Sequence, residues 1–270
     1  MTDLILLPDV ADENSDAAIG FLDDVLRASS IEEIWALHIR RMTVFGFDRM
    51  IYAFTRFRTP NSLLSNLDDS LILSNHHPDY LAEFVQGGLY QAAPMVQWAA
   101  DNIGAQSWRL MADAMRRADL SPGQKRVALL NRRFNISAGY SISFRDVSVR
   151  AKGAIGLCAR ADLTQDDVET IWARHGREIT VLNNVIHLRI SALPFSTGKA
   201  LTDRQREALE WVGDGKTTQD IATIMGLTAA TIEKHLRLAR DALDVDTTAQ
   251  AVLKASFRNQ IFVVPELHSN

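Results

Sequence analysis

Three basic residues, Lys234, Arg237 and Arg240, recur at three-residue spacing near the carboxyl end of the chain. In a helix this spacing keeps them away from an apolar stripe that repeats every four, three and four residues. The stripe consists of Ile232, Leu236, Ala239 and Leu243. Cationic side chains on one helix face suit phosphates, and polar side chains at the start of such a helix suit base edges. This pattern indicates nucleic-acid binding, and the alternative is an ordinary helical hairpin whose basic face is only solvated.

A second predicted helix precedes the basic one at a short interval. Thr217 begins the segment TTQDIATIM, with Asp220 at the spacing of a capping box. Gly226 then supplies a tight turn, and Thr228 caps the basic helix. A helix, a short glycine-containing turn and a second helix place the second helix in the major groove of DNA. The candidate DNA-binding residues are Lys216, Thr218, Thr231, Lys234, His235, Arg237 and Arg240.

The sequence does not indicate catalysis. It contains no nucleophile and base at a recognisable spacing, no glycine-rich phosphate loop and no carboxylates that face one another by spacing. The neighbouring carboxylates of Asp68 and Asp69 fall in a loop and are expected to be solvated. We therefore predict neither an enzyme nor a bound cofactor.

The histidine and cysteine residues do not indicate a metal site. His76 and His77 precede Pro78 without a third ligand at a suitable spacing, so we expect a solvated turn. The single cysteine, Cys158, excludes a disulfide framework and alternates with apolar neighbours, which predicts a small core residue. His38 falls on an apolar helix face and is expected to be a core histidine with a satisfied hydrogen bond.

Composition and charge are those of a globular protein. Of the 270 residues 47% are hydrophobic, including 11 Phe and 5 Trp, which excludes a disordered chain. No apolar run approaches the roughly 20 residues of a membrane helix. The first residues also lack a basic signal-peptide region, so we expect a cytoplasmic protein without membrane contact. The net charge is −4, and after residue 200 there are 8 basic and 10 acidic residues. We therefore expect DNA binding that depends on dimerisation and weakens easily with salt.

The predicted elements that position these residues form two groups: strands and helices in the first 190 residues, and helices alone after residue 200. In the first 190 residues, a few separated strands flanked by helices predict an antiparallel sheet between helical layers. The expected helices are 16–29, 30–46, three short helices that begin at Pro78, Pro94 and Ser121, and 164–190; the expected strands are 49–58, 70–75, 139–144 and 153–161. The fold class is therefore predicted to be α+β, with an N-terminal α/β/α sandwich that has an antiparallel sheet, plus a C-terminal four-helix, all-α helix-turn-helix domain.

Residues 191–200 are predicted to form a linker, because they combine Pro194, Gly198 and small polar residues without a helical period. The chain after this segment has helical patterns throughout. The expected helices are about 202–213, 218–225, 229–243 and 248–258. The predicted domains are 1–190 and 201–270, joined by the linker.

The segment from Leu201 to Leu243 resembles the DNA-binding domain of LuxR-type transcription regulators. The matching residues are Leu201, Thr202, Arg204, Glu207, Leu209, Gly215, Lys216, Thr217, Ile221, Ala222, Thr231, His235 and Leu236, followed by Val245, Ala251 and Val252. The resemblance implies a four-helix domain whose third helix enters the major groove and whose fourth helix helps to pair two copies. Gln205 stands where the family usually has glutamate, at a position that supports helix packing more than it reads DNA.

LuxR-type domains follow several kinds of input module. A phospho-receiver is not favoured, because Asp23 and Asp24 lie in a helix before any strand. The length and element order of residues 1–190 instead resemble the acyl-homoserine-lactone-binding domain of quorum-sensing regulators. Trp108, in the segment AQSW, stands where the family has a lactone-contacting tryptophan. The segment FNISAGYS resembles the family stretch that places Gly139 and Ser141 beside the ligand.

Two departures concern the head of the ligand. Tyr80 and Phe84 match an aromatic pair that encloses it, but the family usually has Trp and Tyr there, so Phe84 lacks a hydroxyl donor for the acyl carbonyl. The family's Asp-Pro pair appears as Ala93 and Pro94, which removes the acceptor for the ligand amide. A buried donor without its acceptor costs about 1–3 kcal/mol. Tyr52, Tyr80 or a water molecule are the candidate replacements.

The candidate ligand-binding residues are Tyr52, Tyr80, Phe84, Ala93, Trp108, Gly139 and Ser141. For the aromatic members, the alternative is that they simply fill a core. The resemblance implies a dimeric quorum-sensing regulator that binds an acyl-homoserine lactone or related small amphiphile and a pseudo-palindromic site on double-stranded DNA, with RNA polymerase as a further partner. The expected dimer contacts are the helix 165–190 and the side chains of Ala249, Val252, Leu253 and Phe257.

Two alternatives remain open from the sequence. Ala93 favours a solo LuxR-type regulator that is ligand-independent or answers a non-lactone signal. A protein-binding adaptor that keeps the helical domain but lacks DNA affinity is the other alternative.

Overall fold

The computed structural model describes residues 13–58, 67–116, 120–146, 148–196 and 199–262. Contacts divide the chain into two compact units. The first unit comprises residues 1–51, 73–144 and 154–190, and the second comprises 52–72, 145–153 and 191–270. The second unit therefore combines the C-terminal part of the chain with two short segments from earlier in the sequence.

The centre of the α/β part is a five-stranded sheet with the strand order β2-β1-β5-β4-β3. Its strands are β1 (Phe47–Thr55), β2 (Ser70–Ser74), β3 (Gly104–Ser107), β4 (Gly139–Ser143) and β5 (Lys152–Ala159). Strand β4 pairs antiparallel with both neighbours, so that Ser141 lies opposite Gln106 of β3 and Gly156 of β5. Every residue of β4 is buried, which requires a cover on both faces of the sheet. The predicted antiparallel sheet is confirmed.

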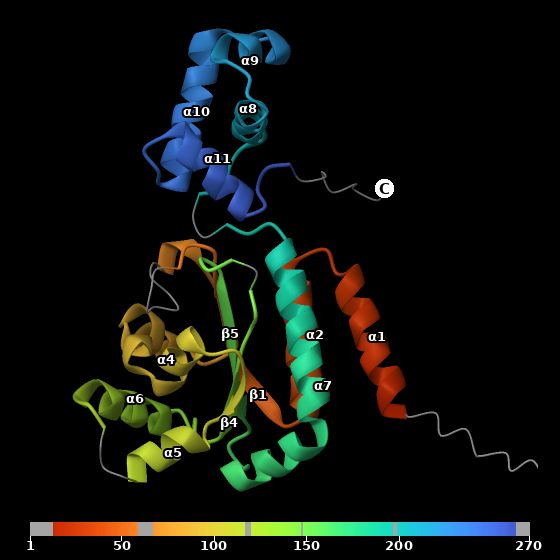
Figure 1. Ribbon diagram of the computed structural model, residues 1–270, viewed down its shortest axis with the longest axis vertical. Coiled ribbons are helices and arrows are strands. Elements are labelled where there is room, and N and C mark those ends of the chain that lie inside the picture. The colour runs from red at the N-terminus through yellow and green to blue at the C-terminus, as the bar shows by residue number, and fades with distance from the viewer. Residues whose placement is uncertain (1–12, 59–66, 117–119, 147, 197–198, 263–270) are drawn as a thin grey trace, which may run out of the picture. The chain divides into compact units, whose positions relative to one another are not determined.

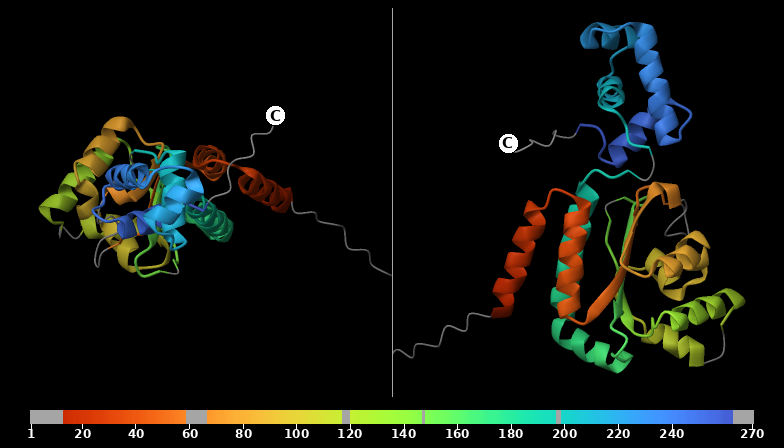
Figure 2. Two further views of the ribbon diagram at one scale, coloured as in Figure 1. Left: turned by 90° about the horizontal axis from the view of Figure 1, so that it is seen from above. Right: turned by 180° about the vertical axis from the view of Figure 1, so that it is seen from behind.

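Helices cover the two faces of the sheet (Figure 1, Figure 2). Helices α2 (Ile31–Val44) and α7 (Gln165–Ala192) lie on one face, with α1 (Glu13–Arg27) outside α2, while α4, α5 and α6 lie on the other. The shorter elements between β2 and β4 are α3 (Pro78–Leu81), η2 (Ala82–Gln86), η3 (Leu89–Ala92), α4 (Pro94–Asp101), α5 (Arg109–Arg116) and α6 (Pro122–Arg133). This arrangement confirms the predicted α/β/α sandwich.

A buried and a partly buried polar pair join α2 to α7. The Nε2 atom of His38 lies 3.1 Å from Oδ1 of Asn183, and both side chains are fully buried. Near the end of α2, Arg41 forms an ion pair with Glu178 at 2.5 Å. Burial lowers the pKa of His38 to about 4, against the opposing effect of its bond to Asn183. His38 is therefore the core histidine that the sequence predicted, and it is neutral near pH 7.

Cys158 lies in the core of the sheet. It is fully buried in β5, as the alternation of its neighbours predicted. Burial raises the pKa of its thiol to about 12, with a smaller opposing effect of Arg49. The thiol is therefore protonated near neutral pH and acts as a small apolar side chain.

Two helix starts follow the local capping signals in the sequence. Ser121 and Gln124 form a complete capping box at the start of α6. At the start of α7, the amide of Thr164 donates to the carboxylate of Asp167, and the amide of Asp167 donates to Oγ1 of Thr164. Because these signals are local, both helix starts can be predicted from the sequence alone.

Three features differ from the sequence-based expectations. Strand β3 and helix α5 are not predicted, because residues 104–116 carry neither a cap signal nor clear alternation. Helix α3 lasts one turn and continues as the π-helical turn η2, and the 3₁₀ turn η3 follows after Gly87 and Gly88. In α1 the expected apolar face is only partly covered, since Ile19 and Leu26 are 60% and 62% exposed while Val25 is buried.

The C-terminal segment of the second unit is helical. Its helices are α8 (Asp203–Gly213), α9 (Thr218–Met225), α10 (Ala229–Leu243) and α11 (Thr248–Phe257), in close agreement with the predicted ranges. Gly226 ends α9 in the left-handed region at φ 66°, which forms the predicted tight turn. Gln205 closes a capping box with Thr202, so it stabilises the start of α8, a local role that the sequence analysis does not name. Across the described ranges, no helix has the length and apolar character needed to span a membrane.

Candidate ligand pocket and nucleic-acid interface

Trp108 lies against the surface of β4 and β5. A Cβ atom at Gly139 would lie 2.9 Å from the indole ring and 2.2 Å from the carbonyl oxygen of Leu157, so only glycine fits there. The indole Nε1 donates a hydrogen bond to Oγ of Ser141 at 2.9 Å. The structure thus brings Trp108, Gly139 and Ser141 together, and it pairs the indole and the hydroxyl with each other.

Tyr80 is the centre of a buried aromatic stack. Its ring stacks on Phe84 with centroids 5.1 Å apart and on His76 with centroids 4.9 Å apart. Phe134 meets the same ring edge-on at 5.6 Å. The phenol donates a hydrogen bond to Oδ1 of Asn131 at 3.2 Å, and burial raises the pKa of Tyr80. The predicted pair of Tyr80 and Phe84 is therefore in contact, and the phenol is a neutral donor that already has an acceptor.

His76 is buried, which corrects the expectation of a solvated turn. Its side chain is 8% exposed, and burial, followed by the charge of Arg49, lowers its pKa to about 4. His77 is exposed as expected, and its Nδ1 accepts a hydrogen bond from the amide of Asp79 at the start of α3. The sequence does not distinguish the two histidines, because the difference arises from the Tyr80 ring that covers His76. Among the described residues, no group of three or more His, Cys, Asp and Glu side chains could hold a metal ion.

Ala93 is buried at the N-terminus of α4. It is the N-cap residue, and no side-chain hydrogen bond caps this helix. The amides of Val96 and Gln97 donate to the Ala93 carbonyl, as they would in any helix start. An aspartate at this position would cap α4 and would offer a carboxylate to a neighbouring donor. Ala93 does neither, so the departure seen in the sequence is also a chemical departure in the fold.

Tyr52 belongs to the second unit, whereas the other six candidate ligand residues belong to the first. Its side chain is fully buried in β1. Burial and the charge of Asp146 raise the pKa of Tyr52, while Arg56 opposes them. Asp146 and Arg56 both belong to the same unit as Tyr52.

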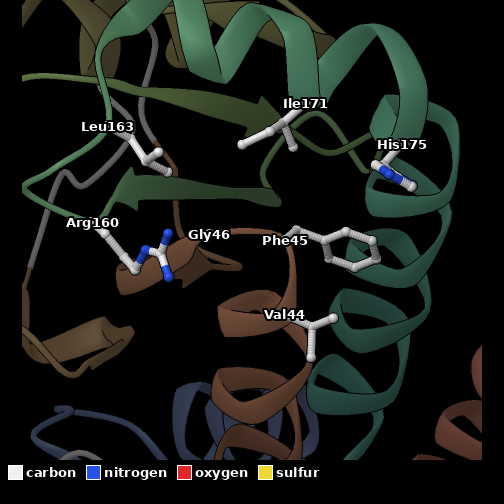
Figure 3. Close-up of a pocket in the computed structure, with 7 residues that line it drawn as sticks. All are labelled: Val44, Phe45, Gly46, Arg160, Leu163, Ile171 and His175. Atoms are coloured by element: carbon white, nitrogen blue, oxygen red, sulfur yellow. The ribbon is translucent and has the colours of Figure 1, made fainter.

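A cleft of about 270 Å³ opens where α2 ends (Figure 3). The residues that line it are Val44, Phe45, Gly46, Arg160, Leu163, Ile171 and His175. Most of its walls are apolar, and the guanidinium of Arg160 is 3.5 Å from the carboxylate of Asp162. None of the candidate ligand residues lines this cleft, so it is distinct from the site that the sequence resemblance implies.

A polar cluster that the sequence reasoning missed joins β4 to α7. Tyr140 stacks on Trp172 with centroids 3.8 Å apart and donates a hydrogen bond to Glu169. Burial raises the pKa of Glu169, but hydrogen bonds from its neighbours outweigh this effect and lower the pKa overall. Because Tyr140 and Ser141 are adjacent in a strand, their side chains point to opposite faces. The cluster thus fixes β4 from the face opposite to Ser141.

Helix α10 buries its apolar stripe and exposes its basic residues. Ile232, Leu236, Ala239 and Leu243 are all at most 4% exposed within the core of α8 to α11. Lys234 and Arg237 are exposed, whereas Thr231 and His235 are half-buried. The burial pattern is therefore that of a helix that packs on its own domain with one face and exposes cations to solvent with the other.

The start of α9 lies next to α10. Oγ1 of Thr218 donates a hydrogen bond to the carboxylate of Glu233 at 2.9 Å. Lys216 is exposed just before α9. The structure therefore brings Thr218 to the basic helix and leaves the ammonium of Lys216 accessible to solvent.

Two of the three basic residues of α10 have partners within the chain. Nη1 of Arg237 lies 3.1 Å from the carboxylate of Asp241. Arg240 is half-buried and donates to Oγ1 of Thr248, the first residue of α11, at 2.9 Å. Arg240 therefore also joins α10 to α11, a role that its spacing in the sequence does not indicate.

Asp69 is largely buried, which corrects the expectation of a solvated loop carboxylate. Its side chain is 13% exposed and forms ion pairs with Lys254 and Arg258 of the C-terminal segment. Nothing near Asp69 in the sequence signals these partners, because they lie more than 180 positions further along the chain.

The chain combines a covered antiparallel sheet with a helix-turn-helix, an architecture that fits a regulator with a ligand-binding and a DNA-binding part. Comparison with known families agrees with this assignment. Residues 30–190 match the autoinducer binding domain, and residues 199–255 match the bacterial regulatory proteins of the luxR family. The chain belongs to the LuxR family of bacterial transcription regulators and carries an autoinducer-binding domain.

Individual relatives are similar over part of their length. The transcriptional activator AnoR of Acinetobacter nosocomialis is 27% identical over 126 residues, and SolR of Ralstonia nicotianae is 34% identical over 128 residues. These alignments cover 46% and 43% of this chain, which spans about half, 52%, of the length of each relative. The N-acylhomoserine lactone dependent factor CepR2 of Burkholderia cenocepacia is 18% identical over 64% of this chain and 96% of its own, with a TM-score of 0.50. This likeness concerns the fold.

Proposed function

We propose that this chain regulates transcription as a homodimer that binds a pseudo-palindromic site on double-stranded DNA through α10. The observation that carries the proposal is the exposure of Lys234 and Arg237 on a helix whose apolar stripe is buried. We assign a sensor domain to residues 1–190, a linker to 191–200 and the DNA-binding domain to 201–270. RNA polymerase is the partner proposed for the activated complex.

For the sensor we propose an acyl-homoserine lactone or a related small amphiphile, bound beside Trp108, Tyr80 and Ser141. Buried aromatic rings with a few polar groups among them support such a ligand. Ala93 offers no acceptor for a ligand amide, which costs about 1–3 kcal/mol unless another group accepts that hydrogen bond. The ligand is therefore best matched to this site if it lacks that amide donor.

A second candidate is a solo regulator that is ligand-independent or answers a non-lactone signal. Two observations favour it: Ala93 lacks a carboxylate, and the Trp108 indole already donates to Ser141 within the chain. A ligand that used this indole would first have to replace an internal hydrogen bond. That exchange reduces the net gain from binding.

The proposed dimer uses exposed apolar positions on two helices. On α7, Val181 and Leu188 are 49% and 64% exposed and lie seven residues apart, which places them on one face. On α11, Leu253 is 52% exposed. Phe257, another expected dimer contact, packs against Phe57 of the same chain with ring centroids 5.6 Å apart.

The DNA proposal is tested by selection from a random library of duplexes with the full-length chain. We expect enrichment of a site with two related half-sites, and gel shifts that weaken steeply as salt is raised. Arg204→Ala is a control, because Arg204 lies on α8 and not on α10. It forms an ion pair with Glu207. If no duplex is enriched and none shifts at low salt, the adaptor alternative replaces this proposal.

The ligand proposal is tested by thermal unfolding with a panel of homoserine lactones. We expect a tight ligand to raise the melting temperature, because it binds the folded state only. Ala93→Asp restores the missing acceptor and is expected to increase the shift for amide-containing lactones. If neither the wild type nor this variant is stabilised, the solo regulator becomes the supported function.

A further inference from the structure

A buried ion cluster in the second unit holds α11 from outside the DNA-binding segment. Nζ of Lys254 and Nη2 of Arg258 lie 2.7 and 2.8 Å from the same carboxylate oxygen of Asp69. The side chains are 13%, 10% and 5% exposed for Asp69, Lys254 and Arg258. One carboxylate thus pairs with two cations from the last turns of α11 and the residue after it.

Arg56 adds a second contact to the same end of α11. Its guanidinium donates to the carbonyl oxygens of Phe257 and Ser191, each at 2.7 Å. A cation at the last carbonyls of a helix satisfies acceptors that have no partner in the helix itself and interacts favourably with the helix dipole. We call Arg56, Asp69, Lys254 and Arg258 the α11 anchor.

The aromatic ring of Phe57 fills the space beside the anchor. It packs on Phe257 at 5.6 Å, and the Lys254 ammonium lies 6.0 Å from the same ring. The segment 52–72 therefore meets α11 through charge, hydrogen bonds and apolar contact. Such an interface is more rigid than one formed by a single surface ion pair.

The anchor differs in kind from the exposed ion pairs of the same unit. Arg237 and Asp241 are 57% and 59% exposed, so water and salt screen their attraction. Removing one carboxylate from a buried cluster instead takes a counter-charge away from cations in a poorly solvated place, which is strongly destabilising. Asp69 is therefore the member of the anchor whose loss should release α11 most completely.

We propose that Asp69 is a positioning residue for DNA recognition, because it anchors α11 to the segment 52–72 and thereby fixes the spacing of the two recognition helices in the dimer. The proposal rests on the proposed function. Helix α11 contacts α10 through Arg240 and Thr248. A change in the orientation of α11 would therefore also change the orientation of α10, which carries Lys234. The segment that anchors it also contains the candidate ligand residue Tyr52.

The anchor itself is tested by amide hydrogen exchange on the full-length chain. For Asp69→Asn we expect the exchange of α11 amides to rise about 100-fold, as for the loss of one partner of a buried ion pair. Asp203→Asn is the matched control, since it removes an exposed carboxylate, 96% accessible, from an ion pair of the same unit. Exchange in Asp69→Asn within about 2-fold of the wild type, as expected for a surface pair, would overturn the anchor.

A second pair of variants keeps the test valid if Asp69→Asn folds poorly. Lys254→Met leaves the pair of Asp69 and Arg258 in place, so we expect a smaller rise in exchange of about 10-fold. The double variant Asp69→Asn with Lys254→Met should exchange more slowly than the product of the two single effects predicts, because it also removes one unpaired cation. Strictly multiplicative effects would show that the two residues do not form one cluster.

The positioning role is tested with the site that the wild type selects. Inserting five base pairs between its half-sites turns one half-site by about half a helical turn, so we expect the wild type to bind it about 10-fold more weakly. For Asp69→Asn this preference should fall to about 2-fold while affinity for a single half-site stays the same. An unchanged spacing preference would overturn the role. If the wild type binds no duplex, the role fails with the proposed function, while hydrogen exchange still decides whether the anchor exists.

Discussion

The two surfaces that we assign to partners are the exposed face of α10 and the candidate ligand site that includes Trp108. They differ in the burial of their polar groups. On α10, Lys234 and Arg237 point into solvent and the helix is held from beneath by a buried apolar stripe. In the first unit the half-buried indole of Trp108 pairs with Ser141, and the buried phenol of Tyr80 pairs with Asn131. On the exposed face of α10 a partner would replace only the solvent-exposed ion pair of Arg237 with Asp241, whereas a ligand beside Trp108 or Tyr80 must replace internal hydrogen bonds. We therefore expect substitutions around Trp108 to affect folding and binding together, and those on the exposed face of α10 to affect binding alone.

The largest expected effect separates the two sides of α10. Leu236 is 4% exposed in the core of the helical segment, so Leu236→Ala should lower the free energy of unfolding by about 2–5 kcal/mol. Lys234→Ala is the control, because this side chain lies on the exposed face of α10 and its loss should change stability by less than about 0.5 kcal/mol. Urea unfolding followed by circular dichroism measures both. Equal losses would mean that α10 has no buried side.

The free energy of unfolding of the first unit should also depend on pH. His38 and His76 have pKa values near 4 in the folded state, whereas an unfolded histidine titrates near 6.5. Between these values the unfolded state binds more protons, so the free energy of unfolding falls as pH falls from about 6.5 to about 4, by up to ~1.4 kcal/mol per pH unit for each histidine.

Urea midpoints at pH 7, 5.5 and 4.5 measure this dependence. In His38→Gln the slope should be smaller, because a buried imidazole with a lowered pKa has been removed. A variant that keeps the full wild-type slope would show that His38 does not contribute to it.

Packing beneath Trp108 gives a third, intermediate effect. Gly139→Ala places a methyl group 2.2 Å from the carbonyl oxygen of Leu157, so we expect a loss of about 1–3 kcal/mol in stability. Gly156→Ala is the matched control, because its methyl group would meet Ile51 at 3.4 Å and Trp108 at 3.7 Å, which are ordinary contacts. Melting temperatures of the two variants compare them directly, and the prediction fails if Gly156→Ala is the more damaging change.

The smallest effect concerns the exposed side of α10. Lys234→Ala should leave the melting temperature unchanged and weaken DNA binding, with the slope of log affinity against log salt reduced by about 1. Arg204→Ala on α8 should leave the slope unaltered. If the two variants have the same slope of log affinity against log salt, Lys234 does not belong to the DNA interface.

The helical segment could be predicted from the sequence almost completely. Its caps at Thr202, Thr217 and Thr228 and its apolar spacing are local signals, and the helices end where these signals end. Local rules were sufficient because each of these helices is short, capped and amphipathic.

The sensor could be predicted only in outline. Strand β3 and helix α5 lack local signals, and the burial of His76 depends on the aromatic ring of Tyr80. Asp69 meets its partners across about 190 positions of sequence, and Arg240 is tied to a helix that begins after it. Contacts of this kind are decided by the tertiary fold, so a pattern read along the chain cannot contain them.

The single buried thiol also makes the chain well suited to spectroscopic labelling. Maleimide and methanethiosulfonate reagents attack thiolates, and burial keeps Cys158 protonated and out of reach of such reagents. A cysteine introduced at the exposed position of Gln219 on α9 would therefore take up one spin label per chain without removal of the native residue. In a dimer the two labels would form one pair, and the distance between them would report directly how far apart the two helix-turn-helix motifs stand before and after DNA is added.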